Sequence, residues 1–257
     1  MKIHCLIENT CDSGLLKAEH GLSMLIETGE HRILFDTGAS DAFAENAECM
    51  GLDLRTVNTV ILSHGHYDHG GGLEHFLAIN HRVKVWASQH AFEPHFNASG
   101  KEIGLPPALQ MHPQIHSAKP PVTELYAGIT LHQGNEIAVD DCAGMTAICN
   151  GVRMQEDFRH EQYLLIQEGD MRILISGCSH RGILNIAEHF RPDILIGGFH
   201  LMKESNTARL STLAVKLHEM PTRFYTGHCT GALAFNTMKQ HLGNQLQRFS
   251  TGDILEL

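Results

Sequence analysis

Short runs of apolar residues recur along the chain and end at polar or glycine-rich positions. Such runs, rich in valine, isoleucine, leucine and aromatic side chains, are typical of strands with both faces buried. The pattern therefore predicts strands at Leu22–Ile26, Arg32–Phe35, Thr59–Leu62, Val83–Trp86, Tyr163–Ile166, Arg172–Ile175, Ile194–Ile196 and Arg223–Tyr225.

Helical periodicity lies between several of these strands. Apolar residues three and four positions apart, such as Leu210, Leu213, Ala214 and Leu217, mark one face of a helix. The early part of the chain is β-rich and the later part alternates helix and strand, which predicts an α/β fold with two packed sheets and helices outside. The expected helices are Asp41–Cys49, Gly72–Ile79, Ile183–His189, Thr207–Met220 and Ala232–Leu242.

No repeat, charge block or low-complexity linker divides the sequence, so we expect a single domain over residues 1–257. One stretch, Phe92–Pro121, contains several prolines and breaks the periodicity. Loops of that length are usually functional or mobile. We interpret residues 92–121 as an insertion over one face of the domain and as a candidate lid.

The charge balance narrows the range of partners. The chain has 19 Lys+Arg and 29 Asp+Glu, a net charge of −10, which argues against nucleic acid or anionic membrane surfaces. Glu8 interrupts the N-terminus before a signal-like apolar core forms, and no stretch approaches the roughly 18 apolar residues of a membrane span. The 7 cysteines are an odd number and include no C-x-x-C pair. We expect a cytoplasmic protein with reduced thiols and a small-molecule substrate.

The segment Ser63–Leu73 carries most of the chemistry, in a chain that has 20 histidines. His64 and His66 are two positions apart, so in an extended segment both rings point the same way and can share one ion. Asp68 and His69 can turn toward a second ion or a metal-bound water. Imidazole and carboxylate ligands suit Zn²⁺, with iron or manganese as alternatives. The segment therefore predicts a metal site with an open position for water.

The same segment resembles the H-x-H-x-D-H motif of the metallo-β-lactamase superfamily, and Ile33–Gly38 resembles its strand followed by D-T-G. Other motifs are similar to one branch, the 7,8-dihydropterin-6-methyl-4-(β-D-ribofuranosyl)aminobenzene-5′-phosphate synthase-like proteins. The resemblance spans nearly the whole chain and implies an αββα sandwich, in which two mixed sheets are flanked by helices and metal lies at one edge. The branch motifs are Glu8–Asn9, Glu19–Ser23, Gly177–Ile183, Gly197–Leu201 and Thr226–Gly231.

The resemblance also implies a set of ligands for one or two ions. Most hydrolases of the superfamily have a G-H-T-x-G element and then a strand that ends in Gly-Asp, but here no Gly-Asp ends the corresponding strand. The strand Arg172–Ile175 leads instead into Gly177-Cys178-Ser179-His180, so His180 is the expected remaining ligand. Cys178 at the aspartate position and His160 before another strand are alternatives. The implied metal ligands are His64, His66, Asp68, His69, His180 and His228.

Several other residues are candidates for supporting or substrate roles. Asp36 is expected to accept a hydrogen bond from a ligand imidazole or from the loop backbone. His200 follows a strand and two glycines, and it is our candidate for a substrate contact or an acid/base. Glu19 and His20 can reach the same pocket or can be a polar pair at a strand start. The run Gly70–Gly72 is a weaker candidate for binding phosphate through backbone N–H groups.

Three hypotheses for the function follow. The first is a metal-dependent hydrolase that uses a metal-activated water on an ester, phosphoester or related bond, with Asp68 orienting the water. The second is the transferase reaction for which the branch is named, which joins a dihydropterin-methyl diphosphate to an aminobenzene riboside phosphate. The third is a non-catalytic protein that binds a metal or a ligand. The substrate can be phosphorylated in the first two cases.

Overall fold

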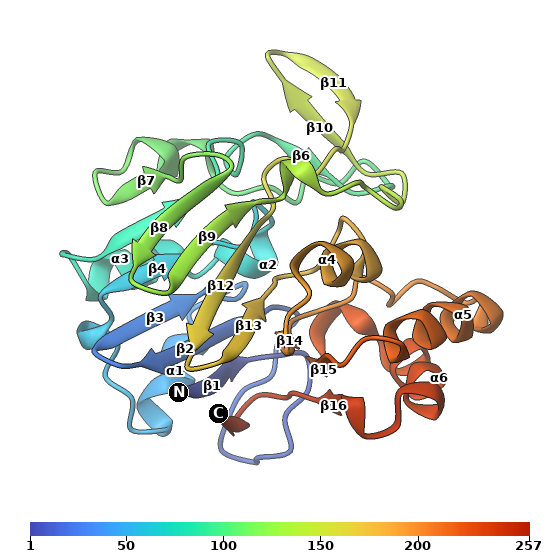
Figure 1. Ribbon diagram of the computed structural model, residues 1–257. Helices are drawn as coiled ribbons and strands as arrows, with labels where there is room; N and C mark the ends of the chain where they lie inside the picture. Colours follow the sequence, from blue (N-terminus) through green and yellow to red (C-terminus); the bar gives the residue numbers. More distant parts are fainter.

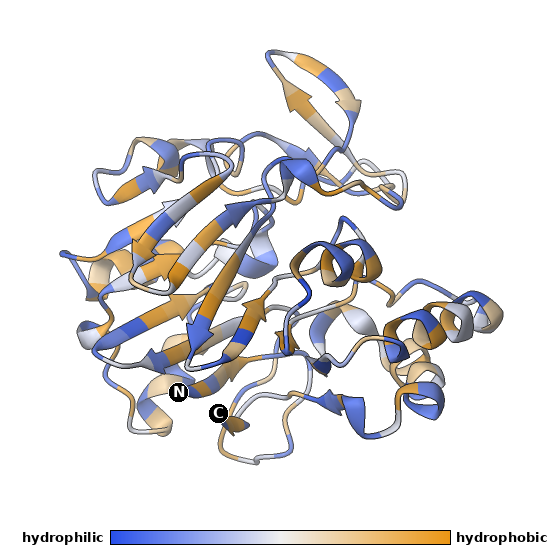
Figure 2. Ribbon diagram, viewed as in Figure 1, coloured by the Kyte–Doolittle hydropathy of each residue, from blue (hydrophilic) through white to orange (hydrophobic).

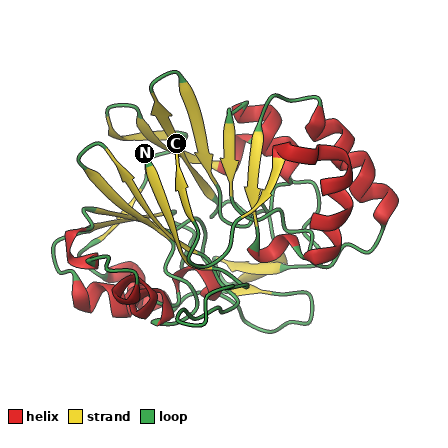
Figure 3. Cartoon of the chain, turned by 90° about the horizontal axis from the view of Figure 1, so that it is seen from below, coloured by secondary structure: helices red, strands yellow, loops and turns green.

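The computed structural model describes residues 1–257 as two large β-sheets packed face to face (Figure 1). Seen from below, both sheets lie between two groups of helices (Figure 3). The seven strands of the first sheet are, in spatial order, β17 (Ile254–Glu256), β1 (Lys2–Ile7), β2 (Ser23–Thr28), β3 (His31–Phe35), β4 (Thr59–Ile61), β5 (Lys84–Ala87) and β7 (Ile115–Ser117).

The second large sheet also has seven strands and is likewise mixed, and a small third sheet has three. The second sheet runs in the order β16 (Leu246–Arg248), β15 (Arg223–Thr226), β14 (Ile194–Ile196), β13 (Met171–Ile175), β12 (Gln162–Glu168), β9 (Ile129–Gln133) and β8 (Val122–Tyr126). The small sheet consists of β11 (Val152–Gln155), β10 (Thr146–Cys149) and β6 (His95–Phe96). The β10–β11 hairpin projects from the body of the molecule (Figure 1).

Helices cover the outer face of each large sheet. The first sheet is covered by α1 (Ala42–Cys49) and α3 (Leu73–Ile79), and the short α2 (Tyr67–Gly70) lies just before α3. The second sheet is covered by α4 (Ile183–Phe190), α5 (Thr207–His218) and α6 (Ala232–Leu242). No helix is both long and apolar enough to cross a membrane. The short 3₁₀ helices are η1 (Leu54–Thr56), η2 (Pro107–Met111), η3 (Gly134–Glu136), η4 (His228–Thr230) and η5 (Gly243–Gln245).

The apolar strand sequences arise because each central strand contributes to two cores. Ile33 and Phe35 of β3 point into the core between the sheets, whereas Leu34 points toward α1 and α3. In β13, Leu174 packs in the core under α4, α5 and α6, and its neighbours face the other sheet. Figure 2 shows apolar stretches along the strands of both sheets, interrupted by hydrophilic positions. The predicted αββα architecture is confirmed.

Every strand and helix expected from the sequence is present, with ends that differ by one or two residues. The sequence analysis did not predict the other strands, which are β1, β6 to β11, β16 and β17. In β9, Ile129 and Leu131 are buried and alternate with the half-buried Thr130 and His132. That alternation is the usual signal of a half-buried strand, and it was present in the sequence.

The stretch 92–121 contains regular structure. It includes β6, η2 and β7, and β7 pairs in parallel with β5 at the edge of the first sheet. Leu105 and Leu109 are buried in the core beside α1 and α3. The second half of the stretch therefore belongs to the first sheet and its core, and a lid role for residues 92–121 stays a prediction.

Parallel pairing places the loops that carry chemistry at one edge of the sandwich. β3 pairs in parallel with β4, and β13, β14 and β15 pair in parallel with one another. Because the carboxyl ends of parallel strands meet at one edge, the loops after these strands converge. They carry Asp36, Ser63, Cys178, His200 and His228.

Candidate metal centre

The loop after β4 carries the H-x-H-x-D-H motif into the interior. His64 and His69 are completely buried, and His66 and Asp68 are nearly so. His66 is extended at the N-cap of α2, and Asp68 and His69 lie within this short helix. Burial, reinforced by neighbouring imidazoles, lowers the pKa of His64 well below its usual value, and burial also lowers the pKa of His66. Both rings are therefore neutral and can offer a lone pair.

Three glycines allow this loop to pack tightly against the loop after β3. A Cβ atom on Gly71 would lie 2.4 Å from the carbonyl oxygen of Ala39, and one on Gly72 would lie 2.4 Å from that of Ser40. The backbone N–H groups of Gly70, Gly71 and Gly72 all donate to carbonyl oxygens of the protein. These N–H groups are not available to a ligand, so the hypothesis that the glycine run binds phosphate is wrong.

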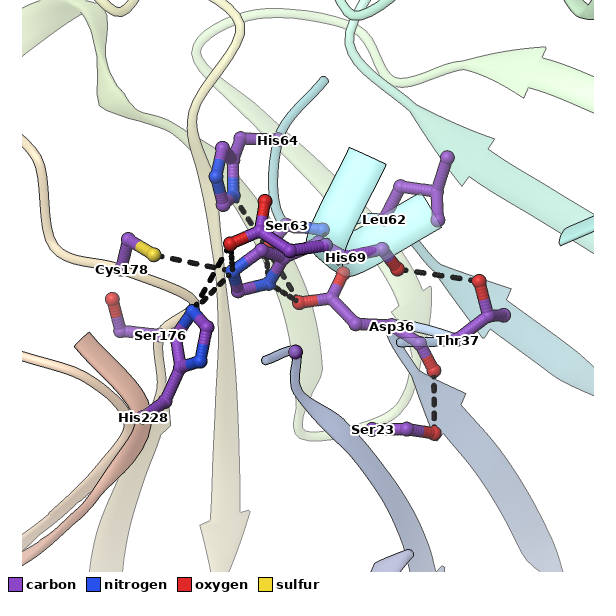
Figure 4. Close-up of polar contacts among 12 residues, drawn as sticks. Ser23, Asp36, Thr37, Leu62, Ser63, His64, His69, Ser176, Cys178 and His228 are labelled. Carbon is purple, nitrogen blue, oxygen red and sulfur yellow. Dashed lines mark hydrogen bonds and ion pairs between the residues drawn. The ribbon is translucent and has the colours of Figure 1, made fainter. Parts of the chain in front are cut away.

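Asp36 is fully buried and accepts hydrogen bonds from the motif loop (Figure 4). Its Oδ1 accepts from the Ser63 N–H at 2.7 Å, and its Oδ2 accepts from the Ser63 hydroxyl at 2.7 Å and from His69 Nδ1 at 2.6 Å. The Ser63 hydroxyl has one proton, which it gives to Asp36, so it accepts from His64 Nδ1 at 2.8 Å. Both imidazoles thus carry a proton on Nδ1 and turn Nε2 toward the centre, and the expected support by Asp36 is confirmed.

His228 reaches the same place from the second sheet. Its backbone N–H donates to the Glu8 carboxylate, and its ring Nδ1 lies 2.8 Å from Asn9 Oδ1. The ring Nε2 lies 3.1 Å from His69 Nε2 and 3.4 Å from Asp68 Oδ2. Asn9 therefore orients His228 as Asp36 orients His69. The Glu8–Asn9 motif was noticed in the sequence, but its contact with His228 was not.

Cys178 lies where two groups of possible ligand atoms meet. One group consists of His64, Cys178 and His180, and the other of His69, Cys178 and His228. The Cys178 Sγ atom lies 3.1 Å from His69 Nε2, and His180 Nε2 lies 3.4 Å from His64 Nε2. The structure therefore brings all six expected ligands and Cys178 to one edge of the sandwich.

The backbone around the centre is unusually constrained. A Cβ atom on Gly177 would lie 2.2 Å from the Ser63 hydroxyl oxygen, so glycine is required where the two sheets approach each other. Asp36, Ser179 and His228 have φ values of 60°, 58° and 43°. Residues with side chains adopt this left-handed region at a cost, and such residues cluster at functional sites. This constrained backbone fixes the directions of the side chains around the candidate metal centre.

The donor set fits a divalent cation. Burial opposes a charge on His69, but the charge of Asp36 and its hydrogen bond outweigh burial and raise the pKa of His69 to about 9. A proton therefore occupies the crowded region between His69 and His228 when no cation does. A cation would displace that proton and satisfy the imidazole and thiol donors together. In addition, three buried ring nitrogens have no hydrogen-bond partner, namely His66 Nε2, His160 Nε2 and His180 Nδ1.

His160 and His95 lie beside this centre and form, together with His66, a further group of possible ligand atoms. His160 Nδ1 accepts the Gly65 N–H at 2.8 Å, so the neutral ring carries its proton on Nε2. His95 stacks on His160 with ring centroids 3.9 Å apart. His95 Nδ1 lies 2.7 Å from the Glu156 carboxylate and its Nε2 lies 3.2 Å from a backbone carbonyl oxygen, so both nitrogens face acceptors. The sequence analysis missed the partner role of His95 and Glu156, because the two residues are far apart in the chain.

A cleft of about 700 Å³ opens at the centre, and the buried residues His66, Asp68, Cys178 and His180 are part of its lining. His200 also lines the cleft, and its ring centroid is 4.1 Å from that of His180. Burial and the nearby charge of Lys203 lower the pKa of His200 to about 4. The apolar part of the lining includes Ile103, Met145, Leu184, Leu201, Met202 and Leu213.

Glu19 and His20 have different roles. The Glu19 carboxylate accepts from the Ala39 N–H at 2.9 Å and from the Ser40 hydroxyl at 2.6 Å, so it holds the loop after β3. His20 lines the cleft, with Nε2 3.3 Å from Asp68 Oδ2. Burial and then His228 lower the pKa of His20. Of this pair, only His20 reaches the pocket.

An αββα fold with clustered histidine, aspartate and cysteine side chains able to bind metal at one edge defines a protein of metallo-β-lactamase type. Residues 16–141 match the metallo-beta-lactamase superfamily. The crystal structure of Tm1679, a metal-dependent hydrolase of the beta-lactamase superfamily, is similar with a TM-score of 0.85 and 30% identity. This similarity covers 100% of this chain and 99% of that one. The chain belongs to the metallo-beta-lactamase superfamily.

The chain is also similar to the 7,8-dihydropterin-6-methyl-4-(beta-D-ribofuranosyl)-aminobenzene-5'-phosphate synthase of Methanocaldococcus jannaschii. The two are 27% identical over 266 residues, which cover 93% of this chain and 90% of the relative. Zn²⁺-bound PqqB from Methylobacterium extorquens shares the fold, with a TM-score of 0.65, 13% identity and 100% of both chains covered. The resemblance expected from the sequence motifs is confirmed for the superfamily and for this branch.

Proposed function

We propose that the protein is a metal-dependent hydrolase that acts on an ester, phosphoester or related bond of a small molecule. The observation that carries the proposal is the pair of ligand groups that share Cys178 at the floor of the cleft. In each group the Nε2 atoms of two imidazoles lie close together. They belong to His64 and His180 in one group and to His69 and His228 in the other. An open cleft beside such a centre leaves room for a substrate and for water.

The proposed ligands divide into two sets. His64, His66 and His180 would hold one ion, and Asp68, His69 and His228 would hold the other, with Cys178 available to both. Nitrogen, oxygen and sulfur ligands together favour zinc, with iron or manganese as alternatives. A bound divalent ion would lower the pKa of its water toward neutrality and supply hydroxide.

His180 is preferred over His160 because of the ring proton. A neutral imidazole that binds metal through Nε2 carries its proton on Nδ1. His160 Nδ1 instead accepts the Gly65 N–H, so its Nε2 is protonated. His180 Nε2 lies 3.4 Å from His64 Nε2, where one ion can bind both atoms.

The residues of the chain have defined tasks in this proposal. Asp68 points Oδ2 toward His228 and toward the cleft, where it can orient a water molecule. His200, neutral near pH 7 and beside His180, can form a hydrogen bond with the substrate. The apolar walls exclude water from the rest of the substrate.

Charged side chains of both signs line the rim of the cleft, and Asp141 is a carboxylate there without an ion pair. Arg209 is neutralised, because it donates to Asp140 and to Glu204 at 3.0 Å each. Lys203 and Lys216 line the same cleft and form no ion pair. A volume of about 700 Å³ lies within the range of sites for drug-sized ligands. We therefore propose a small molecule with an apolar body, in which an anionic group such as a phosphate would lie beside the two lysines.

A second candidate is a transferase that joins a dihydropterin-methyl diphosphate to an aminobenzene riboside phosphate. The name of the Methanocaldococcus jannaschii relative and its 27% identity support this candidate. In that case the centre would bind the diphosphate, and the apolar walls would limit the access of water to it.

The two candidates are separated by assays of the metal-loaded protein. We expect p-nitrophenyl ester or phosphodiester reporters to be hydrolysed with added zinc, manganese or iron, and the His66→Ala variant to lose this turnover. Product only from the pterin diphosphate and the aminobenzene riboside phosphate would support the transferase. No turnover in either assay by a protein that retains metal would favour a non-catalytic binding protein.

Substitutions of Cys178 test whether this residue is a ligand common to both groups. Replacing Cys178 by alanine removes a ligand from both groups, and we expect the affinity for at least one ion to fall more than about 10²-fold, beyond the effect of an outer-shell partner. Replacing it by aspartate supplies a carboxylate that can also join two ions, so this variant should keep both. Titration with zinc and a competing chelator measures the affinities. Wild-type affinity for both ions in Cys178→Ala would show that the thiol is not a ligand.

A further inference from the structure

The amide of Asn9 lies between two imidazoles of the site, His20 and His228. Asn9 Oδ1 lies 2.8 Å from His228 Nδ1, and Asn9 Nδ2 lies 3.1 Å from His20 Nδ1. One side chain therefore presents an acceptor to the first ring and a donor to the second. The two rings face each other across it, with their centroids 5.0 Å apart.

The orientation of this amide is determined by the backbone. Asn9 Oδ1 also accepts the Gly21 N–H at 3.3 Å, and Asn9 Nδ2 also donates to the His228 carbonyl oxygen at 3.3 Å. A backbone N–H can only donate and a carbonyl oxygen can only accept. Turning the amide over would therefore lose both backbone bonds.

The fixed amide imposes opposite tautomers on the two rings. A neutral imidazole has one protonated nitrogen and one lone pair. His228 must donate from Nδ1, so its lone pair is on Nε2, the atom that faces His69 and Asp68. His20 must accept at Nδ1, so its proton is on Nε2, the atom 3.3 Å from Asp68 Oδ2.

The tautomer of His20 excludes it from a ligand group that distances alone would suggest. His20, Asp68 and His228 offer atoms close enough to hold one ion. With its proton on Nε2, His20 has no lone pair to give at that position. Its side chain is about half exposed (48%), lines the cleft and points an N–H group at the carboxylate of Asp68.

We propose that His20 is a hydrogen-bond donor that positions the Asp68 carboxylate and is not a metal ligand, and that Asn9 is the residue that sets this role. The second part of the inference, its effect on turnover, rests on the proposed hydrolase function. The first part concerns the protein itself and holds with or without catalysis. Asn9 thereby leaves the Nε2 lone pair of His228 free to bind a metal ion and keeps a proton on Nε2 of His20.

The first experiment reads the tautomers directly. Long-range ¹H–¹⁵N correlation spectra of the metal-free protein distinguish protonated from unprotonated ring nitrogens, and the His20→Leu and His228→Leu variants assign the signals. We expect the Nε2–H form for His20 and the Nδ1–H form for His228. A wild-type spectrum with Nδ1–H on His20 overturns the proposal, whether or not any substrate is turned over.

Asn9→Asp provides a matched change of one atom type. A carboxylate can only accept, so it still accepts from His228 Nδ1 but now requires a proton on His20 Nδ1. We expect His20 to gain a proton on Nδ1, while Nε2 still faces the Asp68 carboxylate and His228 keeps its form. If Nδ1 of His20 stays unprotonated in the variant, Asn9 does not set the proton position of His20.

The second experiment compares metal content with turnover. His20→Leu should retain both ions, whereas His228→Leu should lose one. In the reporter assay, His20→Leu should lower kcat about tenfold or more, and His20→Gln, whose amide N–H can replace the Nε2–H donor, should recover most of it. Loss of an ion from His20→Leu would make His20 a ligand and overturn the assignment. Unchanged kcat in His20→Leu would remove the positioning role.

Discussion

The double variant His64→Ala, His66→Ala is expected to lose tight binding of one ion and at least about 10³-fold of its activity. Both imidazoles are buried and neutral, and they belong to the ligand set that also contains His180. A metal ion contributes several kcal/mol to charge stabilisation and to activation of water, and each 1.36 kcal/mol is a factor of ten in rate. Elemental analysis and the reporter assay measure the two losses.

The matched control is His218→Ala, His241→Ala, which removes two exposed histidines from helices α5 and α6. This control should keep the metal and the activity of the wild type. Both double variants should retain the far-UV circular dichroism of the fold, because the three main cores do not include these side chains. A His64→Ala, His66→Ala protein with the full metal content would contradict the ligand assignment.

Asp36→Ala is expected to damage both the stability and the metal centre. Asp36 and His69 are both completely buried, and the carboxylate accepts three hydrogen bonds. Removing one partner of a buried ion pair costs roughly 3–5 kcal/mol of the free energy of unfolding. Loss of a group that orients a ligand imidazole also lowers metal affinity by about 10- to 100-fold. Urea denaturation of the metal-free protein and zinc titration measure the two effects separately.

The Asp36→Asn variant separates the effect on stability from the effect on metal affinity. Asparagine tolerates the left-handed backbone at this position, where φ is 60°, and it can still accept the Ser63 N–H. Its NH₂ group would face His69 Nδ1 and move the ring proton to Nε2, which opposes metal binding. We expect a smaller loss of stability than with alanine but a similar loss of metal affinity.

Ser23→Ala is a matched control for Asp36, because the Ser23 hydroxyl donates to the Asp36 carbonyl oxygen at 2.9 Å without touching the carboxylate (Figure 4). It should cost about 1 kcal/mol and leave metal affinity unchanged. If Asp36→Asn binds both ions as tightly as the wild type, the hydrogen bond between Asp36 and His69 does not determine metal binding by His69.

The parts of the site that were predictable from the sequence lie in short segments with a simple backbone. His64 and His66 belong to one extended run after β4, and Asp36 follows the neighbouring parallel strand β3. The ends of parallel strands meet at one edge, so the pairing of these segments follows from the fold class. The family resemblance then added His180 and His228 as expected ligands.

The remaining features depend on contacts between residues far apart in the chain. The choice between His180 and His160 depends on the hydrogen bond from Gly65, 95 residues before His160. The role of Asn9 depends on His228, which is 219 residues away. Such pairs have no periodic signal, and their geometry arises only when the two sheets pack. The position of Cys178 between two ligand groups has the same origin.

The most direct test of the account is the metal content of the protein, purified without an affinity tag and dialysed against metal-free buffer. Elemental analysis should find about two divalent ions per chain, and Cys178→Ala and His228→Leu should each contain fewer. A folded wild-type protein that retains no ion, and binds none when zinc is added, would contradict the central claim that these side chains form a two-ion centre.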